Sequence, residues 1–166
     1  DALMTAGWGE DIRPLGYRAV ESLRLEKGYR AWSADITPND TPPEAGLGWA
    51  VKMKSGREFL GRAALAAAAT QPLTKRLAGF TLNDPAVVLV GRETILRDGQ
   101  PVGYLTSGGY GYSLGQSIGY GYVRNAAGIT DSFLMAGQYE IVVANTAFAA
   151  QIGLTAFYDP SQSRVK

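Results

Sequence analysis

The side chains best suited to chemistry lie between Gly16 and Val51, where Arg30, Trp32 and Asp35 follow one another closely. An indole can stack on a planar ring, while a guanidinium and a carboxylate pair with the polar edge of that ring. This combination predicts a surface that binds a planar, polar small molecule. The alternative is a tryptophan packed in the core and an aspartate that caps a turn.

Two further carboxylates belong to the same stretch. Glu44 precedes Ala45-Gly46-Leu47-Gly48, and glycines let a backbone approach a ligand closely. A carboxylate there can accept hydrogen bonds from an aminopyrimidine-like edge, although a tight loop entering a strand is the alternative. Glu26 lies two residues after Arg24, and helical residues two apart do not face each other. We therefore expect Arg24 and Glu26 to have separate roles. The alternative is that they form ion pairs at the surface or between two lobes of the protein.

The composition excludes several kinds of site. The chain has no cysteine and no histidine, which removes disulfides, thiol nucleophiles, Ser-His-Asp triads and metal sites built on imidazole or thiolate. No carboxylate run has the spacing of a calcium loop, so we predict no metal site. Any chemistry here uses carboxylates, tyrosine, lysine, arginine, the backbone or a cofactor.

The charge balance and hydropathy argue against two classes of partner. Sixteen basic and fifteen acidic residues give a net charge of +1, so no overall field favours nucleic acid or an anionic membrane. No uninterrupted apolar run reaches about 18 residues, and we expect no membrane span. Apolar residues make up 46% of the chain, the ordinary balance of a globular protein.

The run Gly108-Gly109-Tyr110-Gly111-Tyr112 resembles a phosphate-binding loop only superficially. It lacks the Lys-Ser/Thr ending of a P-loop, and it does not open a Rossmann unit. Exposed tyrosines can stack nucleobases, but the near-zero net charge disfavours that role. We interpret the run as a turn of a β-rich lobe with tyrosines packed on its rim.

The front of the chain is predicted to be helical. Ala19, Val20 and Leu23 recur at helical spacing between Tyr17 and Lys27, and Gly28 stands where a left-handed C-terminal residue is expected. The remaining front elements are the end of a helix before Gly9, turns over residues 33–44, a strand over Leu47–Lys52 and a helix over Phe59–Thr70.

After Pro72 the pattern changes to short strands with frequent turns. Asp98-Gly99 between two apolar runs predicts a hairpin over Gly91–Leu105. The other predicted strands are Lys75–Leu82, Gly119–Val123, Tyr139–Val143 and Thr146–Ile152. The sequence therefore predicts an α+β fold, in which a helical front segment over 1–72 is followed by a small antiparallel β-barrel or sandwich over 73–166.

Several motifs, in order, resemble one known family. They are SLRLEKGYRAW, TPPEAGLGWAV, FLGRAAL, GYLTSGGYGYSLGQSIGYGYV and FYDPSQSR. The chain resembles the C-terminal half of the folate-binding aminomethyltransferase (glycine-cleavage T-protein) family, and most of all the folate lobe of dimethylglycine and sarcosine dehydrogenases or oxidases. The resemblance implies that residues 1–72 end the folate-binding subdomain and that residues 73–166 form the C-terminal barrel.

The resemblance also implies a reaction. In that family a flavin lobe oxidises an N-methyl amine to an iminium, and the folate lobe passes the one-carbon unit to tetrahydrofolate, giving methylenetetrahydrofolate. A closed cavity keeps water from the reactive iminium. The implied cofactors are tetrahydrofolate and, on a lobe absent from this chain, FAD. The implied partners are folate and the upstream flavin and folate-lobe regions.

The residues that the resemblance assigns to folate binding are those whose motifs match. They are Glu26, Arg30, Trp32, Asp35, Glu44, Phe157 and Tyr158. No catalytic residue is assigned to this chain, because the acting carboxylate and a pterin-binding glutamate of the family belong upstream of residue 1. We therefore expect this chain to form one wall of the folate cavity and to be inactive alone.

One departure narrows the subfamily, and two alternatives stay open. Val20 stands where glycine-cleavage proteins carry a ligand-binding arginine, with Arg18 nearby, and the demethylating dehydrogenases also lack that arginine.

The alternatives are part of a glycine-cleavage-type aminomethyltransferase that acts on a lipoyl carrier, and a non-catalytic β-barrel interaction module. The expected compartment is the bacterial cytoplasm or the mitochondrial matrix.

Overall fold

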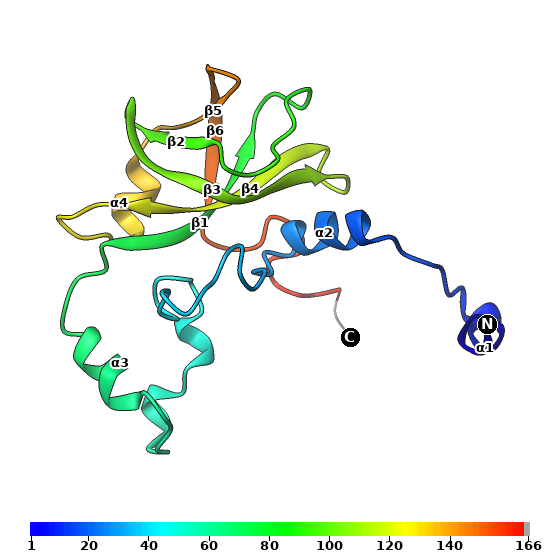
Figure 1. The fold of residues 1–166 in the computed structure, drawn as a ribbon, viewed down its shortest axis with the longest axis horizontal. Coiled ribbons are helices and arrows are strands. Elements are labelled where there is room, and N and C mark those ends of the chain that lie inside the picture. Colours follow the sequence, from blue (N-terminus) through cyan, green and yellow to red (C-terminus); the bar gives the residue numbers. More distant parts are fainter. Residues whose placement is uncertain (165–166) are drawn as a thin grey trace.

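A closed antiparallel β-barrel organises the computed structural model, which describes residues 1–164 (Figure 1). Within these residues the strand order around the barrel is β1-β4-β3-β2-β5-β6, and β1 pairs with β6 to close it. The strands are β1 (Lys75–Leu82), β2 (Thr94–Arg97), β3 (Gln100–Gly111), β4 (Gln116–Arg124), β5 (Tyr139–Val143) and β6 (Thr146–Gly153). Closure leaves no unpaired edge along the sheet.

Two hydrophobic clusters lie on the two sides of this sheet. The first fills the barrel interior and includes the fully buried Phe80, Leu105 and Ile141. The second joins Leu25 to Tyr120, Ile118 and other residues on the outer side of β1 and β4. Because both faces of β1 and β4 are covered, nearly every residue of these two strands is buried.

Helix α2 (Tyr17–Glu26) packs on the outer side of the barrel, mainly over β3 and to a lesser extent over β4. Its buried residues are Ser22, Leu25 and Glu26, whereas Val20 and Leu23 are exposed. The predicted helix is thus confirmed, but the predicted apolar face is wrong. The helix turns a mixed polar and apolar face to the sheet because partners on β3 and its following turn satisfy Ser22 and Glu26.

The other front elements have no buried residues. They are α1 (Ala2–Gly7), the 3₁₀ turns η1 (Trp8–Glu10), η2 (Gly48–Ala50) and η3 (Met53–Ser55), and α3 (Arg62–Ala68). Figure 1 shows α1 far from the barrel and α3 on a long excursion that leads into β1. Helices this short gain little stability from propensity alone. Among the described residues, no helix is long and apolar enough to cross a membrane.

The structure corrects three of the predicted elements and adds one. The predicted strand over Leu47–Lys52 is wrong, because two 3₁₀ turns stand in this region and the closed barrel offers no edge to a further strand. The helix predicted over Phe59–Thr70 is shorter. The tyrosine-rich run belongs mostly to β3 and not to a turn. Helix α4 (Asp131–Ala136), which buries Leu134 against the barrel interior, was not predicted.

Candidate functional site

Asp35, one of the predicted site residues, is almost completely enclosed, with 1% of its surface exposed. Its carboxylate accepts hydrogen bonds from Arg24 Nη1 at 2.7 Å, from the amide of Ala31 at 2.9 Å and from Thr106 Oγ1 at 2.6 Å. Ser107 Oγ donates to it as well. These bonds tie the loop after α2 to the middle of β3, so the carboxylate of Asp35 is fully engaged within the chain.

Glu26 and Glu44 also accept hydrogen bonds from this chain. Glu26, at 1% exposure, accepts from the amide of Ser113 at 2.7 Å in the turn between β3 and β4. One oxygen of Glu44 accepts from the amide and the hydroxyl of Thr41 at 2.8 and 2.7 Å and lies 3.8 Å from Lys75 Nζ. Glu44 therefore closes its own loop and faces β1.

Arg24 and Glu26 have separate partners, as their helical spacing predicts. Arg24 bridges Asp35 and Glu21, whose carboxylate lies 2.8 Å from Arg24 Nη2. Glu26 instead points to the β3–β4 turn. The Arg24–Asp35 pair is nearly buried, with side-chain exposures of 13% and 1%, so it is shielded from the solvent that weakens exposed ion pairs.

Arg30 and Trp32 differ in exposure. Arg30 donates to the carbonyl oxygens of Ala45 and Gly28 at 3.1 and 2.5 Å, and burial, with Arg76 adding to it, lowers the pKa of Arg30. The indole of Trp32 is 67% exposed. Of the front-segment residues in the prediction, Trp32 is therefore the one that presents an aromatic face to solvent.

The C-terminal segment returns to α2 and carries the last two predicted residues. Phe157 packs against Tyr120, with ring centroids 6.3 Å apart, and the amide of Tyr158 donates to Glu26 O at 3.0 Å. Beside them, Lys27 pairs with Asp159 at 3.2 Å. Burial raises the pKa of Asp159, but hydrogen bonds from Ser163, Arg164 and Lys27 outweigh it and lower the pKa to about 2.

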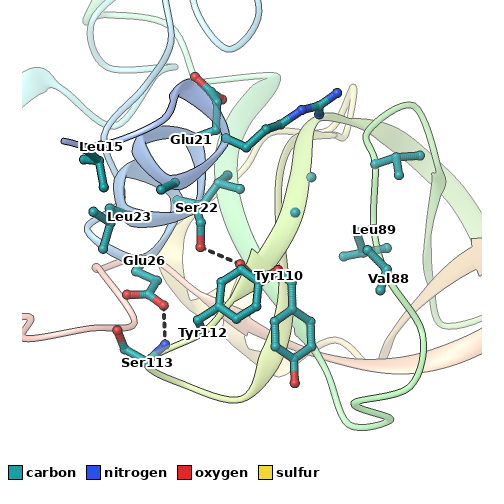
Figure 2. A pocket seen from close by; sticks show the side chains of 16 residues that line it. Leu15, Glu21, Ser22, Leu23, Glu26, Val88, Leu89, Tyr110, Tyr112 and Ser113 are labelled. Atoms are coloured by element: carbon teal, nitrogen blue, oxygen red, sulfur yellow. Dashed lines mark hydrogen bonds between the residues drawn. The ribbon is translucent and has the colours of Figure 1, made fainter.

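A cavity of about 640 Å³ lies between α2 and the β3–β4 turn. Figure 2 shows Ser22 reaching from α2 toward β3 and Glu26 toward this turn, with the rings of Tyr110 and Tyr112 beside them. The two rings meet edge to face at 5.2 Å. The wall is mostly apolar, through Leu25 and residues 88–90, and its volume lies within the range of small-molecule sites.

The structure therefore brings together some predicted residues and separates others. Only Glu26 of the seven lines the cavity beneath α2. Arg30 lines a second cavity of about 410 Å³ at the C-terminal end of α2. Tyr110 and Tyr112 were not selected from the sequence as binding residues. Their alternation with glycine is nevertheless a signal, because residues two apart in an extended segment point to the same face and the intervening glycine leaves the other face bare.

The fold and the cavities define the class of domain: a closed antiparallel β-barrel with a helix and ligand-sized cavities on its outer side. Two family models make it specific: the glycine cleavage T-protein C-terminal barrel domain matches residues 75–159, and the GCVT N-terminal domain matches residues 1–55. The chain belongs to the glycine cleavage T-protein family. The expected family and the α+β barrel fold are thereby confirmed.

The curated relatives of the chain include two mitochondrial dehydrogenases, and the solved structures similar to it include one aminomethyltransferase. It is 40% identical over 167 residues to mitochondrial sarcosine dehydrogenase of Homo sapiens, covering 99% of this chain and 18% of the relative. It is 40% identical over 123 residues to mitochondrial dimethylglycine dehydrogenase of Homo sapiens, covering 74% of this chain and 14% of the relative. The chain thus spans less than a fifth of the length of these relatives.

The solved structure is the glycine cleavage system aminomethyltransferase T from Bartonella henselae. It superposes with a TM-score of 0.79 at 24% identity, over 96% of this chain and 44% of that one. At this identity the likeness establishes the fold alone.

Proposed function

We propose that the chain is the C-terminal, folate-binding portion of a flavin- and tetrahydrofolate-dependent oxidoreductase that demethylates N-methyl amines of the dimethylglycine or sarcosine type. The observation that carries the proposal is the 40% identity to sarcosine dehydrogenase along 99% of the chain. In this proposal the flavin belongs to another part of the parent protein, and this chain supplies one wall of the folate cavity. The parent protein then works in the mitochondrial matrix or in the bacterial cytoplasm.

The residues of the chain fit one wall of a folate site better than a complete site. The exposed ring of Trp32 and the tyrosines of the larger cavity offer flat surfaces on which a pterin or benzoyl ring can stack. Asp35, Glu26 and Glu44 accept bonds from this chain, so their part is to hold the wall in place. Bound tetrahydrofolate supplies the nitrogen atoms that capture the one-carbon unit.

The seven predicted residues thus divide into two proposed roles. Trp32 and Arg30 contact the ligand, because each presents atoms that no group in residues 1–164 engages. Glu26, Asp35, Glu44, Phe157 and Tyr158 position the wall. Asp35 anchors the loop that carries Trp32, and the main chain of Tyr158 fixes the C-terminal segment against Glu26.

Isothermal titration of the full-length parent with tetrahydrofolate tests the proposal. We expect Trp32→Ala to weaken binding by about tenfold, since stacking on an aromatic ring contributes roughly 1–3 kcal/mol. Trp8→Ala, which removes another exposed indole on η1, is the matched control and should bind as the wild type does. Equal affinity for wild type and Trp32→Ala would remove Trp32 from the site.

The parent's product separates this proposal from its alternatives. An oxidoreductase of the proposed type converts an N-methyl amine and tetrahydrofolate into methylenetetrahydrofolate only with an electron acceptor present. A glycine-cleavage-type aminomethyltransferase requires no acceptor and takes its one-carbon unit from an aminomethylated lipoyl carrier; the family matches favour this as the second candidate. No effect of tetrahydrofolate on the product would favour a non-catalytic barrel module.

A further inference from the structure

The segment after the last strand returns across the barrel to α2. Figure 1 shows these residues, 154–164, leaving β6 and passing the C-terminal end of α2. We call them the C-terminal strap. Each of them keeps part of its surface exposed, and segments with few buried contacts open locally at low free energy. The strap is therefore held by a small number of contacts.

An aromatic ring fastens the strap to the barrel. Gly79 in β1 and Gly153 in β6 face each other across the two strands, and a Cβ atom at these positions would lie 2.7 and 2.6 Å from the ring of Phe157. The two glycines therefore leave a slot on the outer side of the sheet. The ring of Phe157 lies in this slot beside Tyr120 and is only partly buried there.

Two polar contacts join the strap to the end of α2. The amide of Tyr158 donates to the carbonyl oxygen of Glu26 at 3.0 Å. Lys27 Nζ donates to the carbonyl oxygen of Asp159 at 3.1 Å and pairs with its carboxylate at 3.2 Å. The side chains of this pair are 16% and 5% exposed, so solvent weakens the pair less than it weakens an exposed one.

The closed position of the strap also has an unfavourable contact. Tyr120 is 5% exposed, and its buried hydroxyl has no hydrogen-bond partner within the described residues. A Cβ atom at Gly28 would lie 3.1 Å from Tyr120 Oη and 3.5 Å from the Cα atom of Ala156, so the strap and Gly28 together wall off this hydroxyl. A buried hydroxyl without a partner loses its bonds to water and gains none in return. Lifting the strap removes this cost, because water then reaches Tyr120.

The strap forms one wall of the second cavity, of about 410 Å³. The opposite wall follows the end of α2 and the loops after it, and it includes Arg30 and Trp49. The strap residues in the wall are Leu154, Thr155, Ala156, Pro160 and Gln162. Movement of the strap away from α2 therefore opens the cavity along one side.

We propose that the C-terminal strap is a gate that opens and closes one wall of the second cavity, and that the walled-off hydroxyl of Tyr120 keeps its open form populated. Phe157, Tyr158 and the Lys27–Asp159 pair hold the closed form. The gate stands without the proposed folate function, although Arg30, to which that function assigns a ligand contact, lies in the same cavity.

Amide hydrogen exchange of the full-length protein, read by mass spectrometry on strap peptides, measures the opening. Tyr120→Phe removes the unpaired hydroxyl, so the strap should open less and its amides should exchange about tenfold more slowly than in the wild type. Tyr139 is also buried with an unpaired hydroxyl, but it lies in the barrel interior. Tyr139→Phe should leave strap exchange unchanged within about twofold. Simple fraying of a chain end predicts no response to either substitution.

A second variant shifts the gate in the opposite direction. Lys27→Gln removes the ion pair with Asp159, and strap exchange should become about fivefold faster, since a hydrogen bond to a charged group is stronger than a neutral one. Arg13→Gln is the matched control, because it removes a pair with Asp11 whose side chains are 78% and 81% exposed. It should leave strap exchange unchanged. Circular dichroism establishes whether each variant is folded.

The reactivity of Tyr120 measures access beneath the strap. N-acetylimidazole transfers its acetyl group to a phenol oxygen, and the phenol proton leaves with the imidazole. In the closed form the hydroxyl of Tyr120 is covered, and burial raises its pKa to about 12, so only the open form reacts. Tandem mass spectrometry should show acetylation of Tyr120 that is faster in Lys27→Gln than in the wild type, by the same factor as strap exchange.

Three results would each overturn the proposal. The first is strap exchange in Tyr120→Phe that is as fast as in the wild type or faster. The second is strap exchange in the wild type that is as slow as that of β1, because the strap then opens only when the whole barrel unfolds. The third is acetylation of Tyr120 that does not respond to Lys27→Gln.

Discussion

At the residue scale, one carboxylate joins three parts of the chain. Asp35 receives hydrogen bonds from α2 through Arg24, from its own loop through Ala31, and from β3 through Thr106 and Ser107. The hydroxyl of Tyr122 in β4 adds a bond to the carbonyl oxygen of Asp35 at 3.0 Å. The loop that presents Trp32 is therefore held to the barrel mainly by polar contacts at a single side chain.

Substituting Asp35→Asn should destabilise the fold by about 3 kcal/mol. The change leaves the nearly buried Arg24 without its charged partner, and it places the NH₂ group of the asparagine against neighbours that are themselves hydrogen-bond donors. The free energy of unfolding from urea titration measures this loss. Asp11→Asn is the control: Asp11 pairs with Arg13 at 2.6 Å but is 81% exposed, so a change below about 0.5 kcal/mol is expected. Equal losses in the two variants would show that Asp35 is not an anchor.

The sequence could indicate the chemistry of the individual site residues but not their partners. The types and spacing of Arg30, Trp32 and Asp35 marked a polar and aromatic surface. Whether a carboxylate faces a ligand or the chain itself depends on residues far away in sequence, such as Thr106 for Asp35 and Ser113 for Glu26. No local pattern contains that pairing. The unpaired hydroxyl of Tyr120 is likewise visible only once the barrel is formed.

At the element scale, close contact between β3 and its neighbours depends on adjacent glycines. A Cβ atom at Gly108 would lie 2.6 Å from the amide nitrogen of Gly91 and 2.9 Å from that of Val90, which are backbone atoms. A Cβ atom at Gly109 would meet only Leu25 Cδ1, the end of a flexible side chain, at 2.8 Å. The glycine-rich run thus allows β3 to lie between α2 on one face and the 89–91 segment on the other.

Gly108→Ala should therefore destabilise the protein by about 2 kcal/mol, because the backbone around Gly91 must move to admit a methyl group. Gly109→Ala is the matched neighbour, and we expect it to cost less than about 1 kcal/mol because Leu25 can change its rotamer. The shift of the thermal unfolding midpoint measures both. A larger loss for Gly109→Ala than for Gly108→Ala would contradict this account of the packing.

The elements that the sequence predicted well are those with strong local signals. The strands over Lys75–Leu82 and Tyr139–Val143 are confirmed to the residue, and Asp98-Gly99 does turn the hairpin between β2 and β3. The predicted strand over Leu47–Lys52 failed because a strand needs a partner, and the barrel closes through β1 and β6 without it. The buried face of α2 was misassigned because polar contacts, and not apolar spacing, fix its orientation.

At the scale of the whole molecule, burial is distributed unevenly along the chain. The barrel strands and α2 contribute most of the buried side chains, whereas α1, α3 and the 3₁₀ turns contribute none. All three tryptophans are at least two-thirds exposed and belong to the front of the chain. The division between residues 72 and 73, predicted from the change of sequence pattern after Pro72, remains a prediction, and this difference in burial offers a way to test it.

Amide hydrogen exchange of the 166-residue chain should separate the two parts. Local opening ranges from near zero free energy in unpacked segments to the global value in a core. We expect amides of β1 and β4 to exchange only through global unfolding, and those of α1 and α3 to exchange almost as fast as unstructured peptide, because no buried side chain holds these short helices. Helix α2, anchored by Leu25, serves as the internal control and should show intermediate protection. Protection of α3 equal to that of β1 would mean that residues 1–72 and 73–166 form one cooperative unit, and the proposed division would then be wrong.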